Sequence, residues 1–148
     1  MKIILGADHG GFELKNNIAK WLETQGHQIE DIGTFSNESV DYPDFSLKVA
    51  HEVANGNFEK GVLVCGSGVG VMLAANKVKG IRAVQCHDTV VARLSREHND
   101  ANIITMGGRF IAKELAYEII SVWLNTEFLN GRHSKRIEKI TLIEKSEI

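Results

Sequence analysis

The stretch Gly61-Val-Leu-Val-Cys-Gly-Ser-Gly-Val-Gly-Val-Met-Leu-Ala-Ala75 decides the fold class of this chain. Residues 61–65 form a short apolar run that ends in a cysteine, residues 66–70 alternate glycine with other residues, and residues 71–75 are apolar again. A buried strand that turns through glycines into a helix is the repeating unit of α/β proteins. If the fold belongs to this class, the same alternation must recur along the chain.

Short runs rich in β-branched residues do recur, and several are apolar on both faces, as parallel strands buried between helices are. Together with residues 61–65 they make five predicted strands, the others being residues 2–6, 28–32, 81–85 and 102–106. Helical patterns separate these strands, and six helices are expected around residues 14–22, 43–53, 71–78, 90–98, 111–119 and 132–144. The alternation predicts one domain over residues 1–148, a three-layer α/β/α Rossmann-like sandwich around a five-stranded parallel sheet.

The composition excludes several classes of partner. A net charge of −2 gives no general attraction to nucleic acid or to an anionic membrane surface. No run approaches the ~20 apolar residues that span a bilayer, and the N-terminus predicts a strand rather than a secretion signal, so we expect a cytoplasmic protein. Two distant cysteines and six histidines without an HxxxH pair predict reduced thiols and no metal site.

Ligands of open parallel sheets bind beyond the carboxyl ends of the strands, so the residues that follow each predicted strand are candidates for a site. The loop of residues 6–11, after the first strand, carries Asp8 and His9 between glycines. Asp8 can contact a ligand or only cap the next helix, and His9 can contact a ligand or only lie at the surface. The loop lacks the Gly-Lys-Ser/Thr ending of a Walker A phosphate loop.

The glycines of residues 66–70 allow backbone N–H groups at a helix start to approach an anion or a developing oxyanion. Their GxGxG spacing does not match the GxGxxG dinucleotide fingerprint. Cys65 lies beside this helix start, where the N–H groups and the helix dipole favour a thiolate, and it is a candidate base or nucleophile. The alternative is a small buried apolar residue, which is the interpretation that we prefer for Cys86.

Polar residues near the ends of the last helices and strands complete the set of candidates. His98 suits a general acid or base near neutral pH, although a lone histidine is usually structural, and the adjacent Asn99 adds a donor. Arg109 follows the last predicted strand and therefore falls at the ligand edge of the sheet. Arg132 and Arg136 lie four residues apart on one helix face, either as a phosphate site or as a solvated basic surface.

Several stretches, taken together, resemble the sugar-phosphate isomerase family that contains ribose-5-phosphate isomerase B and the allose- and galactose-6-phosphate isomerases. The resemblance covers nearly the whole chain and rests on Gly6-Ala-Asp-His-Gly-Gly-Phe12, Val40-Asp-Tyr-Pro-Asp44, Cys65-Gly-Ser-Gly-Val-Gly70, Ala74-Ala-Asn-Lys77, Gly80-Ile-Arg-Ala83, Leu94-Ser-Arg-Glu-His-Asn-Asp100 and Gly131-Arg-His133. Such stretches in the order of the family are far more specific than one glycine loop.

The resemblance implies an aldose-ketose isomerase that works through a cis-enediolate without a metal or cofactor. It implies that Cys65 is the base, that His98 opens the sugar ring and that Ser67 helps to shuttle protons. Backbone amides would hold the enediolate oxygen, from Gly66, Ser67, Gly68, Val69 and Gly70. Side chains would hold the sugar hydroxyls, from Asp8, Tyr42 and Asn99, and the phosphate, from His9, Arg109, Arg132 and Arg136.

The family is dimeric and shares its active sites between subunits, so the resemblance also implies a homodimer and leaves a tetramer open. His98, Asn99 and Arg109 would come from the partner, and the C-terminal helix is a candidate to pack on it. Val71 stands where another branch has a glutamate base, which leaves Cys65 as the base here. The leading hypothesis is interconversion of ribose 5-phosphate and ribulose 5-phosphate. The alternatives are a six-carbon isomerase, a phosphate-binding module without chemistry and a cysteine hydrolase.

Overall fold

Five parallel strands form one sheet in the computed structural model of this protein, which describes residues 1–146. The order across the sheet is β2-β1-β3-β5-β4, with bounds β1 Lys2–Ala7, β2 Gln28–Asp31, β3 Lys60–Cys65, β4 Ala83–Gln85 and β5 Ile103–Gly107. All five predicted strands are confirmed to within two residues at each end. The predicted α/β fold around a parallel sheet is therefore confirmed, while the last two residues of the predicted domain lie outside the described part.

Helices connect the strands and follow the last one, with bounds α1 Phe12–Thr24, α2 Tyr42–Ala54, α3 Val69–Ala75, α4 Thr89–Asn99, α5 Lys113–Asn125 and α6 Arg132–Glu144. Pro43 occupies the first turn of α2, as predicted. The third helix begins two residues earlier than predicted, because Gly68 takes the left-handed conformation that starts it, and it ends before Val78. Ile111 precedes α5 instead of starting it, although its side chain is buried.

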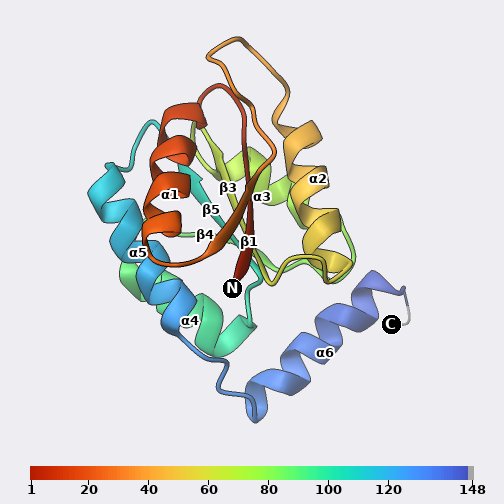
Figure 1. The fold of residues 1–148 in the computed structure, drawn as a ribbon. Coiled ribbons are helices and arrows are strands. Elements are labelled where there is room, and N and C mark those ends of the chain that lie inside the picture. Colours follow the sequence, from red (N-terminus) through yellow and green to blue (C-terminus); the bar gives the residue numbers. More distant parts are fainter. Residues whose placement is uncertain (147–148) are drawn as a thin grey trace.

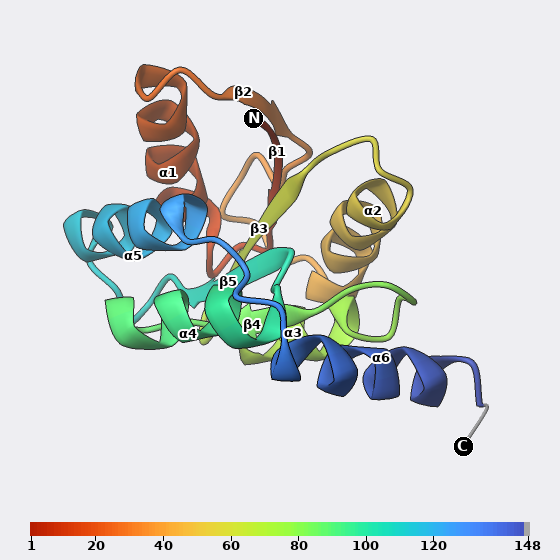
Figure 2. The ribbon, with the colours of Figure 1, turned by 90° about the horizontal axis from the view of Figure 1, so that it is seen from below.

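The helices cover both faces of the sheet, with α1, α4 and α5 on one face and α2 and α3 on the other (Figures 1 and 2). Successive side chains of a strand point to opposite faces. In β1, Ile3 therefore joins the core beneath α1 and α5, and Ile4 joins the core beneath α2. The same alternation directs Cys65, the last residue of β3, toward the α2 and α3 side.

The strand order reverses next to β1, and this reversal places the site. From β1 the chain first forms β2 on one side and then crosses to β3 on the other side. In open α/β sheets the crevice beyond the carboxyl ends of the strands at such a reversal is the usual position of a ligand. The loops that follow β1 and β3, which carry Asp8 and Cys65, meet at this crevice.

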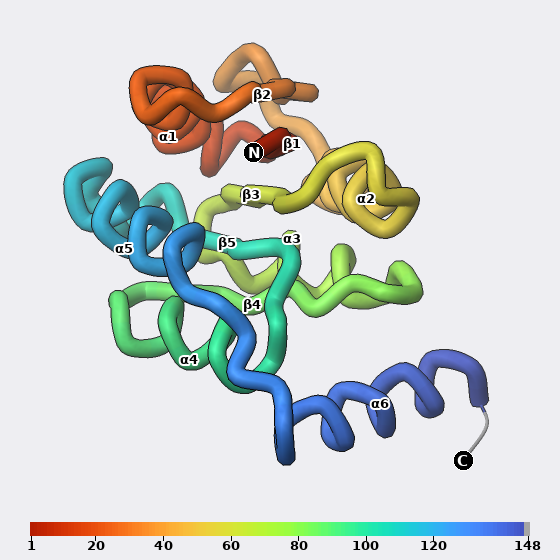
Figure 3. Tube along the Cα trace, turned by 60° about the horizontal axis from the view of Figure 1, so that its bottom comes forward, coloured from red at the N-terminus to blue at the C-terminus, as the bar shows by residue number. Residues whose placement is uncertain are grey.

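The helix α6 stands apart from the three layers, below the amino-terminal edge of the sheet in the view of Figure 1 and at the end of the tube in Figure 3. Leu129 N, before α6, donates to Glu97 O of α4 at 3.1 Å, and Glu144 near its end accepts from Gly80 N. Ile140 is 40% exposed and Ile143 is 59% exposed. The apolar stripe of α6 is therefore incompletely covered by its own chain. Within residues 1–146 no helix combines the length and apolarity needed to cross a bilayer.

Candidate functional site at the carboxyl edge of the sheet

Three loops meet at the carboxyl edge, and glycines allow them to approach closely. The loop after β5 bonds to the end of β3, since Gly108 N donates to Cys65 O at 2.8 Å and Arg109 N donates to Gly66 O at 3.2 Å. A Cβ on Gly108 would lie 2.6 Å from Gly10 O, and a Cβ on Gly10 would lie 2.9 Å from Gly66 N. Larger residues would separate these loops, so the glycines hold them together as one surface.

A cavity of about 300 Å³ opens where these loops meet. It is lined by Asp8, Tyr42, Cys65, Gly66, Ser67, Gly70, Arg109 and Phe110. All of them except Phe110 are residues that the sequence singled out. Phe110 has a ring that is 78% exposed, and an isolated aromatic residue has no pattern to mark it. Its place beside Arg109, directly after a strand, is the one sequence signal that could have identified it.

Cys65 lies at the buried side of this cavity and is only 4% exposed. Gly68 N donates a hydrogen bond to its sulfur at 3.1 Å, which is a contact that a thiolate can accept. The N–H groups of Gly66 and Ser67 donate to no acceptor among residues 1–146. These two amides are therefore free to bind an oxygen atom of a ligand beside the sulfur.

The glycine loop keeps this shape because Gly68 has a φ of 82°, a left-handed conformation, and its carbonyl accepts from the Thr105 hydroxyl of β5 at 2.8 Å. A Cβ at Gly68 would lie 2.7 Å from Met106 C. The hydroxyl of Ser67 accepts from Val69 N at 3.2 Å. The loop is thus fixed by the neighbouring strand and presents a hydroxyl as well as amides to the cavity.

We expect Gly68→Ala to lower the free energy of unfolding by ~3 kcal/mol or more, because a left-handed alanine costs ~1 kcal/mol and the clash with β5 adds to it. Gly56→Ala is the matched control, since Gly56 has a φ of 77° and open space around its Cβ position, and it should cost only ~1 kcal/mol. Urea denaturation of both variants measures the difference. Equal losses would show that the contact with β5 does not constrain the loop.

Cys86 provides an internal comparison for Cys65, because it is fully buried in the core on the opposite face of the sheet. Burial raises the pKa of the Cys86 thiol to about 12. Only ~10⁻⁴ of such a thiol is ionised at pH 8, and the thiolate is the form that alkylates. We therefore expect iodoacetamide at pH 8 to label Cys65 and spare Cys86, as peptide mass spectrometry would measure. Comparable labelling of both residues would contradict this prediction.

Asp8 is 8% exposed and uses one carboxylate oxygen to shape its own loop. Its Oδ1 accepts from Gly10 N at 2.9 Å and from Gly11 N at 3.2 Å, just before α1 begins. Its Oδ2 accepts no hydrogen bond within residues 1–146. The two interpretations that the sequence left open are therefore compatible, because one oxygen organises the helix entry and the other is available to a ligand.

His9 and Tyr42 lie on the side of the cavity formed by the connection from β2 to α2. The Nδ1 atom of His9 accepts from Val40 N at 3.2 Å, so the neutral ring carries its proton on Nε2. His9 itself does not line the cavity. The ring of Tyr42 lies against Gly70, where a Cβ would be 2.7 Å from it. Any side chain at Gly70 would displace Tyr42 from the cavity.

Arg109 lies in the cavity of its own chain, next to Gly66, and it forms no ion pair with another described residue. The family resemblance led us to expect this arginine from a partner subunit. The pairing of β5 with β3 explains the difference, because it places the residues after β5 directly beside Cys65 of the same chain. The simpler expectation, that Arg109 falls at the ligand edge of its own sheet, agrees with the structure.

A second group of predicted residues lies at the opposite edge of the sheet. Because α4 leads from β4 back to the start of β5, its last residues, His98 and Asn99, lie near the amino ends of the strands. Arg82, which directly precedes β4, donates to Asn99 O at 2.8 Å and confirms this position. Arg132 and Arg136 lie in the first turns of α6, close to the same helix end. One chain therefore does not bring these four predicted residues to Cys65.

A pair of stacked imidazoles joins α4 to α6 at this edge. The rings of His98 and His133 lie 4.3 Å apart with an interplanar angle of 11°. His133 is 6% exposed, and burial together with the nearby charges of His98 and Arg132 lowers its pKa below the usual value. The sequence named His133 only as part of the stretch Gly131-Arg-His133 and gave it no role, since its burial depends on how α6 meets α4.

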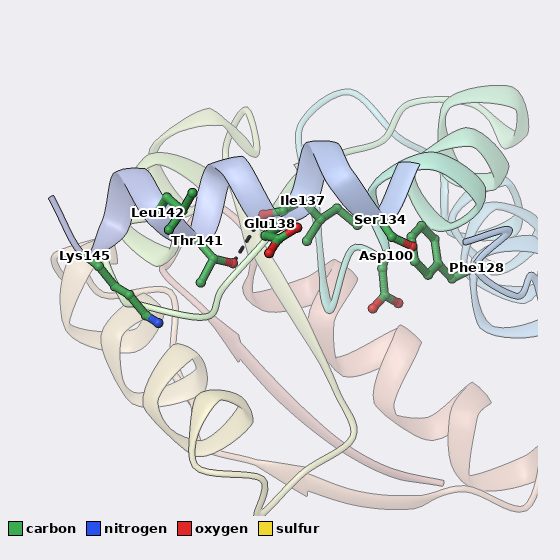
Figure 4. A pocket seen from close by; sticks show the side chains of 8 residues that line it. All are labelled: Asp100, Phe128, Ser134, Ile137, Glu138, Thr141, Leu142 and Lys145. Carbon is green, nitrogen blue, oxygen red and sulfur yellow. Dashed lines mark hydrogen bonds between the residues drawn. The ribbon is translucent and has the colours of Figure 1, made fainter. Parts of the chain in front are cut away.

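A larger cavity of about 470 Å³ lies between the end of α4 and one face of α6 (Figure 4). Figure 4 shows mixed side chains along it, among them Phe128, Ile137 and Lys145, without a cluster of catalytic groups. The smaller cavity at Cys65 is the better candidate for chemistry, because it combines a thiol, unbonded amides and an arginine. The part of the chain that the structure describes has no cluster of three His, Cys, Asp or Glu residues that could hold a metal.

The fold and the cavity together define a doubly wound α/β protein with a candidate ligand site at its strand reversal. The model of the ribose/galactose isomerase family matches residues 3–140. This chain belongs to that family.

Individual relatives cover almost the whole chain. Ribose-5-phosphate isomerase B of Escherichia coli is 47% identical over 143 residues, which are 97% of this chain and 96% of the relative. A D-erythrulose-4-phosphate isomerase of Pectobacterium atrosepticum is 41% identical over 148 residues, 99% of this chain and 97% of the relative. The solved structure of ribose-5-phosphate isomerase B from Clostridium thermocellum has a chain that is 51% identical to this one in sequence. The two structures superpose with a TM-score of 0.98, and the match covers 100% of both chains.

Proposed function

We propose that this protein interconverts D-ribose 5-phosphate and D-ribulose 5-phosphate. The observation that carries the proposal is the arrangement of Cys65, the unbonded amides of Gly66 and Ser67, and Arg109 around one cavity. Transfer of a proton between adjacent carbons needs a base, stabilisation of an oxyanion and a handle for the rest of the substrate. The relatives from E. coli and C. thermocellum, which carry the name ribose-5-phosphate isomerase B, support this choice of substrate.

In the proposed reaction, the Cys65 thiolate removes the proton from C2 of the open-chain aldose and returns it to C1. The electron pair moves to the C1 oxygen, and the resulting cis-enediolate is stabilised by the amides of Gly66 and Ser67. One such donor is typically worth ~3 kcal/mol of barrier, so these amides and the base have comparable importance. The hydroxyl of Ser67 would carry the remaining proton from O2 to O1. Asp8 and Tyr42 would hold the sugar hydroxyls.

The proposal includes a homodimer with shared sites. His98 would open the furanose ring by donating a proton to the ring oxygen as the bond from C1 to that oxygen breaks, while the C1 hydroxyl loses its proton to solvent and becomes the carbonyl. Arg132 with Arg136 would bind the phosphate. Because these residues lie at the edge opposite to Cys65, a second copy has to supply them. Two exposed apolar side chains support such an association, Leu73 of α3 at 55% exposure and Ile143 of α6 at 59%. An isologous pair would complete two sites at once.

The length of the preferred sugar can be measured by comparing substrates. The relative from P. atrosepticum is named an isomerase of a four-carbon sugar phosphate, which makes erythrulose 4-phosphate a second candidate substrate. Allose 6-phosphate is the six-carbon candidate substrate. We expect kcat/KM to be at least tenfold higher for ribose 5-phosphate than for either, since one misfitting carbon is worth roughly 1–3 kcal/mol. A higher value for the four- or six-carbon sugar would replace the proposed substrate.

Exchange of the substrate C2 hydrogen with deuterium from solvent tests whether the chain has any chemistry. A protein that only binds phosphate cannot exchange this hydrogen, and neither can a cysteine hydrolase. Exchange observed by NMR supports proton transfer by an enediolate route. Because Cys65 can also return the same proton to C1, the route is rejected if neither exchange nor formation of ribulose 5-phosphate is detected at saturating ribose 5-phosphate. The proposal also places the protein in the cytoplasm, because a phosphorylated sugar does not cross an apolar bilayer unaided.

A further inference from the structure

Two stretches of sequence have no role in the proposed chemistry, Ala74–Lys77 and Gly80–Ala83. In the structure they belong to one hydrogen-bonded unit at the amino edge of the sheet, and this unit ends at His98 and Asn99. We propose that Arg82 is a positioning residue, which fixes the end of α4 and thereby the place from which His98 opens the sugar ring. The inference rests on the proposed function for the role of His98.

The backbone around Arg82 is held on both sides by asparagine side chains rather than by the sheet alone. Asn76 donates to Ala83 O at 2.9 Å and accepts from Ala83 N at 2.8 Å. Asn102 accepts from Arg82 N at 2.9 Å and donates to Gly80 O at 2.8 Å. Four side-chain hydrogen bonds therefore fix residues 80–83. The backbone that carries the guanidinium group of Arg82 is thus held in place.

The guanidinium of Arg82 binds the last turn of α4. Its Nε donates to Asn99 O at 2.8 Å, and its Nη2 donates to Asp100 O at 2.9 Å and to Asp100 Oδ2 at 3.2 Å. Carbonyl groups at a helix end have no partner inside the helix, and a charged donor satisfies them strongly. The planar fork reaches two successive carbonyls together, which a lysine ammonium group cannot do with the same geometry.

Asp100 is held from its other side by a second arginine. Its backbone is left-handed, with a φ of 46°, and its Oδ1 accepts from Arg96 Nη1 at 2.7 Å. Arg96 is 8% exposed, and its Nη1 also donates to Ala101 O at 2.7 Å. The carboxylate therefore lies between two guanidinium groups. These contacts hold the end of α4, where a helix usually frays.

His98 lies directly before Asn99 and two residues before Asp100 in this turn. Its backbone position follows from the contacts of Arg82 with Asn99 and Asp100, and its ring is stacked on His133 at 4.3 Å. Arg82 does not touch the imidazole and acts only through the backbone. A displacement of a catalytic group by about 1 Å can cost ~100-fold in rate, so the anchor is expected to matter for the step that His98 performs.

The test compares Arg82→Met with Arg93→Met, an exposed control on α4 that breaks the Arg93–Glu97 ion pair and leaves Asn99 and Asp100 untouched. Ribose 5-phosphate exists mostly as a furanose ring, whereas ribulose 5-phosphate has no free hydroxyl that can close a furanose. We expect Arg82→Met to lower kcat about tenfold with ribose 5-phosphate and less than threefold with ribulose 5-phosphate. Arg82→Lys should give an intermediate loss, and Arg93→Met should resemble the wild type.

A purely structural role for Arg82 would reduce the active fraction and lower both kcat values by the same factor, which would overturn the inference. So would an Arg82→Met variant that behaves like Arg93→Met. Hydrogen exchange of the Asp100 and Ala101 amides gives a readout that needs no activity, and we expect it to accelerate at least tenfold in Arg82→Met. If the wild type does not interconvert the two sugars, the proposed function fails. Unchanged exchange would instead reject the anchoring by Arg82.

Discussion

Replacement of Cys65 by alanine is expected to lower kcat for the interconversion of ribose and ribulose 5-phosphate by ~1,000-fold, because a positioned base contributes roughly 10²–10⁴. The fold and the phosphate contacts should persist, since the change removes one sulfur atom at a site between a strand and a turn. A coupled spectrophotometric assay measures the loss of kcat. Isothermal titration calorimetry with ribose 5-phosphate measures the binding that remains.

Cys86→Ala is the matched control for this experiment. It removes the same atom from a residue that is equally buried but lies on the other face of the sheet, away from the cavity. We expect near-normal kcat and a loss of stability of about 1 kcal/mol. If Cys65→Ala kept near-normal kcat while it bound the substrate, Cys65 would not be the base. A similar loss in Cys86→Ala would point to general destabilisation instead.

Mixing two inactive variants should restore activity if sites are shared between subunits. Cys65→Ala and His98→Asn each damage every site of their own homodimer. A mixed dimer carries both changes in one site and neither in the other. Random pairing gives half mixed dimers, so the mixture should recover about a quarter of the wild-type activity. Co-refolding the two denatured variants at equal concentration and measuring kcat per total protein provides the value.

The control mixture combines Cys65→Ala with Cys65→Ser, which alter the same half of the site and cannot complement each other. This mixture should stay as inactive as its components. If the Cys65→Ala and His98→Asn mixture also stayed inactive, although native mass spectrometry showed mixed dimers, Cys65 and His98 would not act in a site shared by two chains. The outcome therefore decides how the two separated groups of residues are used.

The fold could be predicted from local patterns because the strands are short, most of them are apolar, and a helical pattern follows each of them. The prediction was inaccurate where hydrogen bonds of side chains, rather than hydrophobic periodicity, determine the local structure. The predicted fourth strand began at Ile81, but β4 begins at Ala83, because asparagine side chains bind the preceding backbone. In α4 the buried face includes Ser95 and Arg96, which no hydrophobic pattern can reveal. Ser95 Oγ donates to Ala92 O within the helix, and Arg96 Nε donates to the distant Thr126 O.

The candidate site was predictable in its parts and not in their arrangement. Asp8, Cys65 and Arg109 were found because parallel strands bring their carboxyl ends to one edge. His98 and Asn99 could be identified as candidates by residue type. The direction of α4 places them at the amino edge of the sheet, opposite to Cys65. Phe110 was missed and His133 was given no role, because an exposed ring and a stacked ring acquire their places only from tertiary contacts. The roles assigned to these residues stay predictions until the variants are measured.

The position of α6 also has a consequence for how the protein is made. The five strands and the cavity at Cys65 are complete in the first 131 residues, whereas Arg132 and Arg136 belong to the last helix. A ribosome releases the C-terminal segment last, and earlier parts of a chain can fold before it. A chain that terminates early therefore retains every strand of the sheet but lacks the two arginines. Completion of synthesis, rather than formation of the sheet, determines when Arg132 and Arg136 join His98 and Asn99 at the amino edge of the sheet.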